Sequence, residues 1–141
     1  MFSDAIVAAN APLPVVAAVL EDGAGRVLIA QRPAHKHLAL KWEFPGGKIE
    51  PNESPEAALA RELHEELGVE IEISRALPVF EHDYGDIVIA MHPFVCRIAP
   101  RSSAPQAHEH AALRWVLLAE LATLDLAAAD LPIVAALRQS R

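Results

Sequence analysis

One helix, expected over residues 54–67, constrains this chain more than any other segment. Ser54 suits the N-cap, Pro55 suits the first turn, and Gly68 offers the C-terminal stop. An apolar residue recurs every four positions, at Leu59, Leu63 and Leu67. Such a stripe is buried when the helix packs on the rest of the protein.

Glutamates stand beside this stripe at positions i, i+3 and i+4, namely Glu62, Glu65 and Glu66. Their carboxylates share one helical face and repel one another, so they call for a counter-charge. Arg61 supplies part of it, and oxygen ligands of this kind favour Mg²⁺ or Mn²⁺ over zinc. Gly46 and Gly47 upstream let the backbone approach a ligand or a metal closely. The glutamates alone also fit a solvated acidic helix face.

A longer pattern separates these two interpretations. It reads Gly47-x5-Glu53-x7-Arg61-Glu62-Leu63-x-Glu65-Glu66-x-Gly68-Val69 and specifies nine positions across 23 residues. The pattern resembles the Nudix box. Residues 41–50, KWEFPGGKIE, resemble the MutT branch of the Nudix hydrolases, whose members split nucleoside triphosphates into a monophosphate and pyrophosphate. Residues 106–110, QAHEH, and 129–132, ADLP, resemble its bacterial CTP pyrophosphohydrolase type.

This resemblance covers roughly residues 15 to 138 and implies the α/β (α+β) Nudix fold, a mixed β-sheet sandwiched between α-helices. It makes Glu62 the residue that activates the attacking water, with Glu53 and Arg61 orienting the glutamates. The implied metal ligands are the carbonyl of Gly46 and the carboxylates of Glu65, Glu66 and Glu109. Glu109 also fits a solvated loop residue, although its context favours the ligand role. His108 and His110 invite a zinc site, although loop histidines are usually exposed.

The residues that the resemblance places at the substrate are Arg32, His37, Phe44, Lys48 and Asp130. Arg32 and His37 are equally compatible with a surface arginine and a loop histidine, and Phe44 with a core residue. Asp130 stands where the MutT pattern has asparagine. Because a carboxylate only accepts hydrogen bonds, it suits an amino group such as cytosine N4 and argues against strict 8-oxo-dGTP specificity. Asp130 also fits a cap of the helix that follows it.

The remaining elements follow from apolar runs and turn signals. Residues 15–20 and 26–31 around the turn at 21–25 predict a β-hairpin. Residues 43–44 are extended, and Pro45-Gly46-Gly47 is expected to break the chain. Further predicted elements are strands at 69–80, 86–98 and 111–118, a polar turn at 81–85, and a terminal helix at 131–139.

The chain has 141 residues, which fits one domain over 1–141 with residues 1–14 as a loosely ordered arm. A net charge of −7 argues against a nucleic-acid surface. No run predicts a membrane span or a signal peptide. Cys96 lies in an apolar run and is expected to be a buried structural thiol. We therefore expect a cytoplasmic protein, either a monomer or a homodimer, with a small-molecule nucleotide as its partner.

The main functional hypothesis is metal-dependent hydrolysis of a modified nucleoside triphosphate, such as 8-oxo-dGTP, or of a CTP-like pyrimidine nucleotide. A second hypothesis is hydrolysis of another nucleoside diphosphate-linked substrate, such as ADP-ribose. A third is a catalytically inactive Nudix domain that senses a ligand. The intact glutamates at positions 62, 65 and 66 argue against the third.

Overall fold

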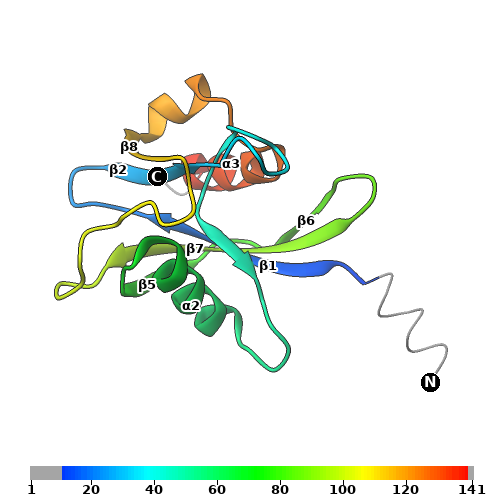
Figure 1. The fold of residues 1–141 in the computed structure, drawn as a ribbon, viewed down its shortest axis with the longest axis horizontal. Coiled ribbons are helices and arrows are strands. Elements are labelled where there is room, and N and C mark those ends of the chain that lie inside the picture. Colours follow the sequence, from blue (N-terminus) through cyan, green and yellow to red (C-terminus); the bar gives the residue numbers. More distant parts are fainter. Residues whose placement is uncertain (1–10, 140–141) are drawn as a thin grey trace.

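The computed structural model describes residues 11–139. Its strands are β1 (Leu13–Leu20), β2 (Arg26–Gln31), β3 (Trp42–Glu43), β4 (Gly46–Lys48), β5 (Ile71–Ala76), β6 (Phe80–Asp83), β7 (Val88–Ile98) and β8 (Ala112–Leu117). Its helical segments are α2 (Pro55–Leu67), η1 (Leu118–Thr123), η2 (Ala128–Asp130) and α3 (Leu131–Gln139). Figure 1 shows α2 and α3 on opposite sides of the strands, which confirms the expected sandwich of sheet between helices.

Strand β1 is the centre of the larger sheet, paired antiparallel with β4 and parallel with β7. Because side chains alternate along a strand, its residues divide between two cores. Val16, Ala18 and Leu20 pack with the leucines of α2, whereas Ala17 and Val19 pack with the core that α3 covers. A strand buried on both faces has a continuous apolar sequence, as this one does.

The predicted hairpin of β1 and β2 is wrong. The turn forms, with an antiparallel bridge between Glu21 and Val27, but the two strands then separate into different sheets. Both edges of β1 are already occupied by β4 and β7, so β2 pairs instead with β3 and β8. Local turn signals could not reveal this competition from distant strands.

The predicted strand at 69–80 and the predicted turn at 81–85 are also wrong in part. The segment forms two strands, β5 and β6, which pair with successive parts of β7. Pro78 lies between them, and proline has no N–H to donate to a sheet. The turn therefore moves to Tyr84–Ile87, where the Tyr84 N–H donates to the Ile87 carbonyl at 2.8 Å.

Pro45-Gly46-Gly47 does not break the chain, because Gly46–Lys48 forms strand β4 against β1. A Cβ on Gly46 would collide with the backbone carbonyl of Val16, so glycine is required for this close approach. The predicted arm at 1–14 is wrong at its end, since β1 already begins at Leu13. Residues 1–10 lie outside the described residues.

Helix α2 forms as predicted. The Ser54 Oγ accepts the Ala57 N–H at 3.1 Å, Gly68 ends the helix at φ 70°, and the three leucines of the stripe are fully buried. Cys96 is also buried as predicted, and burial raises the pKa of its thiol to about 12. Within residues 11–139, no helix is both long enough and apolar enough to span a membrane.

Candidate active site

The three glutamates of α2 differ in burial. The side chains of Glu62 and Glu66, one turn apart, are 16% and 8% exposed, whereas that of Glu65 is 54% exposed. Glu66 belongs to the buried side of the helix, beside Leu63 and Leu67. A buried carboxylate is retained only where a partner compensates its charge or where it stays protonated. The face therefore has the properties of a binding site rather than of a solvated surface.

Arg61 joins the acidic residues into one network. Its guanidinium donates two parallel hydrogen bonds to Glu53, at 2.8 and 2.9 Å, and a third to Glu62 Oε1 at 3.0 Å. It also donates to the Lys48 carbonyl of β4 at 3.0 Å. The hydrogen bonds from Arg61 lower the pKa of Glu53 to about 2, and their geometry fixes both side chains.

Strand β4 lies directly against the Glu62 carboxylate. A Cβ on Gly47 would collide with that carboxylate, so a side chain at this position would displace Glu62. Gly46 is needed for the contact with β1, and Gly47 for the contact with α2. The two glycines thus bring the backbone of β4 between the central strand and the acidic helix.

The environment of Glu66 fits a cation. Burial raises the pKa of Glu66 first of all, and the hydrogen bond and charge of Glu62 raise it further. The carboxylates of Glu43 and Glu109 act in the same direction. Within the part of the chain that the structure describes, no three acidic, histidine or cysteine side chains already converge as a metal-binding group. The site fits a divalent cation because it concentrates carboxylates, whose mutual repulsion such an ion would reduce by binding their oxygen atoms.

Glu43 is a functional candidate that the sequence analysis did not single out. One of its carboxylate oxygens accepts from Arg32 Nη1 at 3.1 Å, and the other lies 3.0 Å from His110 Nε2. His110 Nε2 is also 3.8 Å from Glu66 Oε1. Contrary to the expectation for a loop histidine, the His110 side chain is only 6% exposed, and its buried Nδ1 has no hydrogen-bond partner among the described residues.

The loop that follows β2 is organised around Arg32. Its Nε donates to the His37 carbonyl at 2.7 Å, and its backbone pairs with those of Leu40 and Lys41. Leu38 and Leu40 have φ values of 57° and 62°, a conformation that leucine rarely adopts. Strain of this kind persists where surrounding contacts enforce it, commonly at a binding site.

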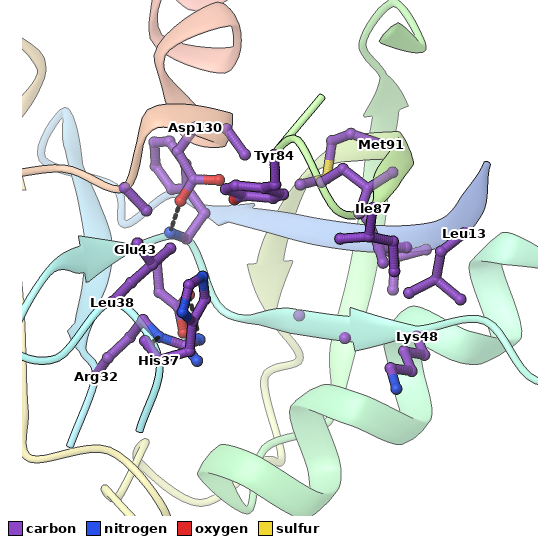
Figure 2. Close-up of a pocket in the computed structure, with 18 of the residues that line it drawn as sticks. Leu13, Arg32, His37, Leu38, Glu43, Lys48, Tyr84, Ile87, Met91 and Asp130 are labelled. Atoms are coloured by element: carbon purple, nitrogen blue, oxygen red, sulfur yellow. Dashed lines mark hydrogen bonds and ion pairs between the residues drawn. The ribbon is translucent and has the colours of Figure 1, made fainter. Parts of the chain in front are cut away.

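Two cavities meet at this network. A smaller one of about 140 Å³ lies mainly among charged residues, namely Arg32, Lys36, Glu43, Glu66 and Glu109, with His110, Pro33 and Gly46. A larger one of about 400 Å³ is mainly apolar and has Asp130 and Phe44 in its lining. Figure 2 shows Arg32 and His37 at one end of this larger cavity and Lys48 at another.

Asp130 is buried in the wall of the larger cavity. Its Oδ2 accepts the Phe44 N–H at 2.8 Å, a contact between residues 86 positions apart (Figure 2). Burial raises the pKa of Asp130 to about 8, while the hydrogen bond from Phe44 opposes the shift. A protonated carboxyl group donates as well as accepts, so the premise that Asp130 can only accept does not hold near neutral pH.

Comparisons with known proteins identify the family. The family model described as NUDIX domain matches residues 11–137. The chain belongs to the Nudix family. It is 40% identical over 124 residues to the CTP pyrophosphohydrolase of Escherichia coli, covering 88% of this chain and 90% of that protein. It is 45% identical over 83 residues to the 8-oxo-dGTP diphosphatase of Proteus vulgaris, covering 59% and 74%.

Among solved structures, the solution structure of the E. coli ORF135 protein matches with a TM-score of 0.80 and 38% identity, covering 94% of this chain and 92% of that one. The expected Nudix fold is therefore confirmed, and Nudix hydrolases generally depend on a divalent metal.

The residues predicted from the Nudix resemblance fall into three groups. Glu53, Arg61 and Glu62 are joined by hydrogen bonds, with Glu65 at 3.5 Å from Arg61. The smaller cavity brings together Gly46, Glu66, Glu109 and Arg32. The larger one brings together His37, Phe44, Lys48 and Asp130. Sequence reasoning missed Glu43 and placed His110 in solvent, although both stand in segments that carried the resemblance.

Proposed function

We propose that this chain is a nucleoside triphosphate pyrophosphohydrolase that converts a (d)NTP to the monophosphate and pyrophosphate and removes unwanted nucleotides from the pool. It is a hydrolase of phosphoanhydride bonds. One observation carries the proposal more than any other: two largely buried carboxylates of one helix face lie at the glycine strand β4, Glu62 against Gly47 and Glu66 in the lining of the charged cavity. That cavity shares Arg32, Glu43 and Gly46 with the apolar one.

In this proposal Glu62 accepts the proton of the attacking water. Arg61 holds the Glu62 carboxylate in a fixed position through the 3.0 Å hydrogen bond, as a general base requires. Glu53 in turn fixes Arg61 through two hydrogen bonds. The carboxylate therefore stays in place while the water reacts, which limits the reorganisation needed in the transition state.

The charged cavity is suited to the polyphosphate. Arg32 and Lys36 offer positive charge there, and His37 lies at the near end of the larger cavity. The residues proposed to hold Mg²⁺ or Mn²⁺ are Glu65, Glu66, Glu109 and the carbonyl of Gly46. A bound divalent ion supplies neutralisation of phosphate oxygens and a lower pKa for the attacking water.

The apolar cavity is suited to the nucleoside. Asp130 and the neighbouring backbone of Phe44 provide polar groups for the edge of the base. With a pKa of about 8, Asp130 can accept from a cytosine amino group when ionised and donate to a carbonyl oxygen when protonated. The proposed substrates are accordingly CTP-like pyrimidine nucleotides and oxidised guanine nucleotides, in keeping with the names of the two relatives.

We further propose that the enzyme works in the cytoplasm, as a monomer or homodimer. The buried Cys96, the single cysteine of the chain, supports a compartment in which thiols stay reduced.

The test is a turnover assay over natural and oxidised nucleoside triphosphates, with Mg²⁺ or Mn²⁺ and with excess chelator. We expect pyrophosphate release that requires the metal, with CTP or 8-oxo-dGTP among the best substrates. Turnover in excess chelator would defeat the mechanism. A clear preference for ADP-ribose would support the second hypothesis, and nucleotide binding without any hydrolysis would support the ligand sensor.

A further inference from the structure

The turn between β6 and β7 presents Tyr84, the single tyrosine of the chain, in a fixed position. The Tyr84 N–H donates to the Ile87 carbonyl at 2.8 Å, and the Gly85 N–H donates to Asp83 Oδ1 at 2.7 Å. Gly85 adopts φ 95°, which glycine tolerates without strain. The turn is therefore closed by its own hydrogen bonds and holds the tyrosine in a defined direction.

Two imidazole rings orient the Tyr84 side chain further. Its ring centroid lies 4.5 Å from that of His82 on β6, with an interplanar angle of 72°. It lies 6.3 Å from that of His37, at 78°. Both are edge-to-face arrangements, which stabilise an aromatic pair beyond the area that it buries. The His37 contact links the turn to the loop at the polyphosphate end of the site.

The Tyr84 ring lies in the lining of the larger cavity, beside Asp130 (Figure 2). Burial raises the pKa of Tyr84, and the charge of Asp130 adds to this effect, as expected for close neighbours. The lining around Tyr84 is apolar, with Leu13, Val15, Ile87, Ile89 and Met91. Ile87 is 44% exposed, so this lining contains an apolar side chain that a ligand would cover.

The shape and chemistry of the larger cavity suit the nucleobase of a nucleotide. Arg32 and His37 lie at one end, where the guanidinium of Arg32 suits phosphates. The rest of the lining is mainly apolar, apart from the acidic and basic side chains of Glu43, Lys48, Asp86 and Asp130. A volume of about 400 Å³ falls within the range of small-molecule sites. A nucleobase is planar and apolar on its faces and polar at its edge, so it matches an aromatic ring placed next to Asp130.

We propose that the ring of Tyr84 is the surface against which the nucleobase packs, which makes Tyr84 a substrate-contacting residue alongside Asp130. This inference rests on the proposed function. It assigns the edge of the base to Asp130 and one of its faces to Tyr84. The ring, rather than the hydroxyl group, provides the contact, so it acts on every base.

The experiment measures binding in the Glu62→Gln background, in which turnover is expected to be suppressed. Calorimetric titrations use CTP, GTP and inorganic tripolyphosphate, which carries phosphates but no base. The variants are Tyr84→Leu, Tyr84→Phe and the control Phe80→Leu. Phe80 also packs against the core from β6, but it is not in the lining of the cavity.

We expect Tyr84→Leu to raise the Kd of both nucleotides roughly tenfold or more, the usual cost of losing an aromatic contact with a base. The Kd of tripolyphosphate should stay unchanged, Tyr84→Phe should bind like the parent, and Phe80→Leu should not reproduce the selective loss. Equal weakening of all three ligands would show a structural role and overturn the inference. An unchanged nucleotide Kd in Tyr84→Leu would also overturn the inference. So would a rise in nucleotide Kd in Tyr84→Phe as large as that in Tyr84→Leu, because the hydroxyl group would then provide the contact.

The inference would also be overturned if the Glu62→Gln parent bound nucleotides no more tightly than it binds tripolyphosphate. Turnover by the wild-type enzyme tests the proposed function separately, so a failure of one can be told from a failure of the other.

Discussion

Replacing Asp130 with asparagine should make the folded protein less sensitive to pH. Asp130 is 4% exposed, and its Oδ2 accepts the Phe44 N–H at 2.8 Å. Asparagine has nearly the same shape and retains an oxygen for that hydrogen bond, but it cannot ionise. The exchange therefore removes the buried charge and leaves the packing in place.

The magnitude follows from the raised pKa. Burial raises the pKa of Asp130 from 3.8 to about 8, so between these values the folded state binds the proton more tightly than the unfolded state. Stability should therefore fall as pH rises through this window, by about 1.4 kcal/mol per unit. From pH 5 to pH 7 the wild type should lose on the order of 3 kcal/mol relative to Asp130→Asn.

Urea unfolding followed by tryptophan fluorescence at several pH values measures this difference. The free energy of unfolding of Asp130→Asn minus that of the wild type should grow steadily from pH 5 to pH 7 and level off above pH 8. The exchange of Asp125, which is 71% exposed, to asparagine controls for the loss of one formal charge. Parallel stability curves for wild type and Asp130→Asn would refute the reasoning, because Asp130 would then ionise normally in the folded state.

Further predictions concern the chemistry. Asp130 should make the preference between bases depend on pH: above pH 8 the wild type should favour cytosine nucleotides more, whereas Asp130→Asn should not change. If the ratio of kcat/KM for cytosine and guanine nucleotides stays constant from pH 6 to 9 in the wild type, Asp130 does not recognise the base. Glu62→Gln should lower kcat by roughly 10²–10⁴-fold with little change in KM, and a variant with more than half of wild-type kcat would exclude Glu62 from the chemistry. Glu66→Gln should raise the metal concentration needed for half-maximal activity, and an unchanged titration would contradict its role as a ligand. Gly47→Ala should displace the Glu62 carboxylate and lower kcat at least roughly tenfold with little change in Tm, whereas Gly46→Ala should lower Tm because its Cβ meets backbone. Equal effects on Tm would argue against this distinction.

Local sequence was sufficient where an element depends on its own residues. The cap at Ser54, the leucine stripe and the stop at Gly68 predicted α2 correctly, because these signals act within the helix. The resemblance to the Nudix box likewise predicted the family, because its nine specified positions lie within one short stretch of the chain. The roles of the box residues remain predictions that the proposed variants test.

The prediction was wrong where distant segments compete for the same partner. The hairpin of β1 and β2 is absent because β4 and β7 occupy both edges of β1. The same strand pairing turns Gly46–Lys48 into β4, where a break was expected. Which strands pair depends on contacts between segments that are distant in the sequence, and the residues of a local turn carry no information about those contacts.

The sequence by itself determined the acidic helix, the glycines before it and the family. Only the tertiary structure decided which of those groups are buried and what they touch. It placed Glu43 between Arg32 and His110, and it placed Asp130 against the Phe44 amide, 86 residues away. A pKa depends on burial and on neighbouring charges, and both arise only when remote segments pack together.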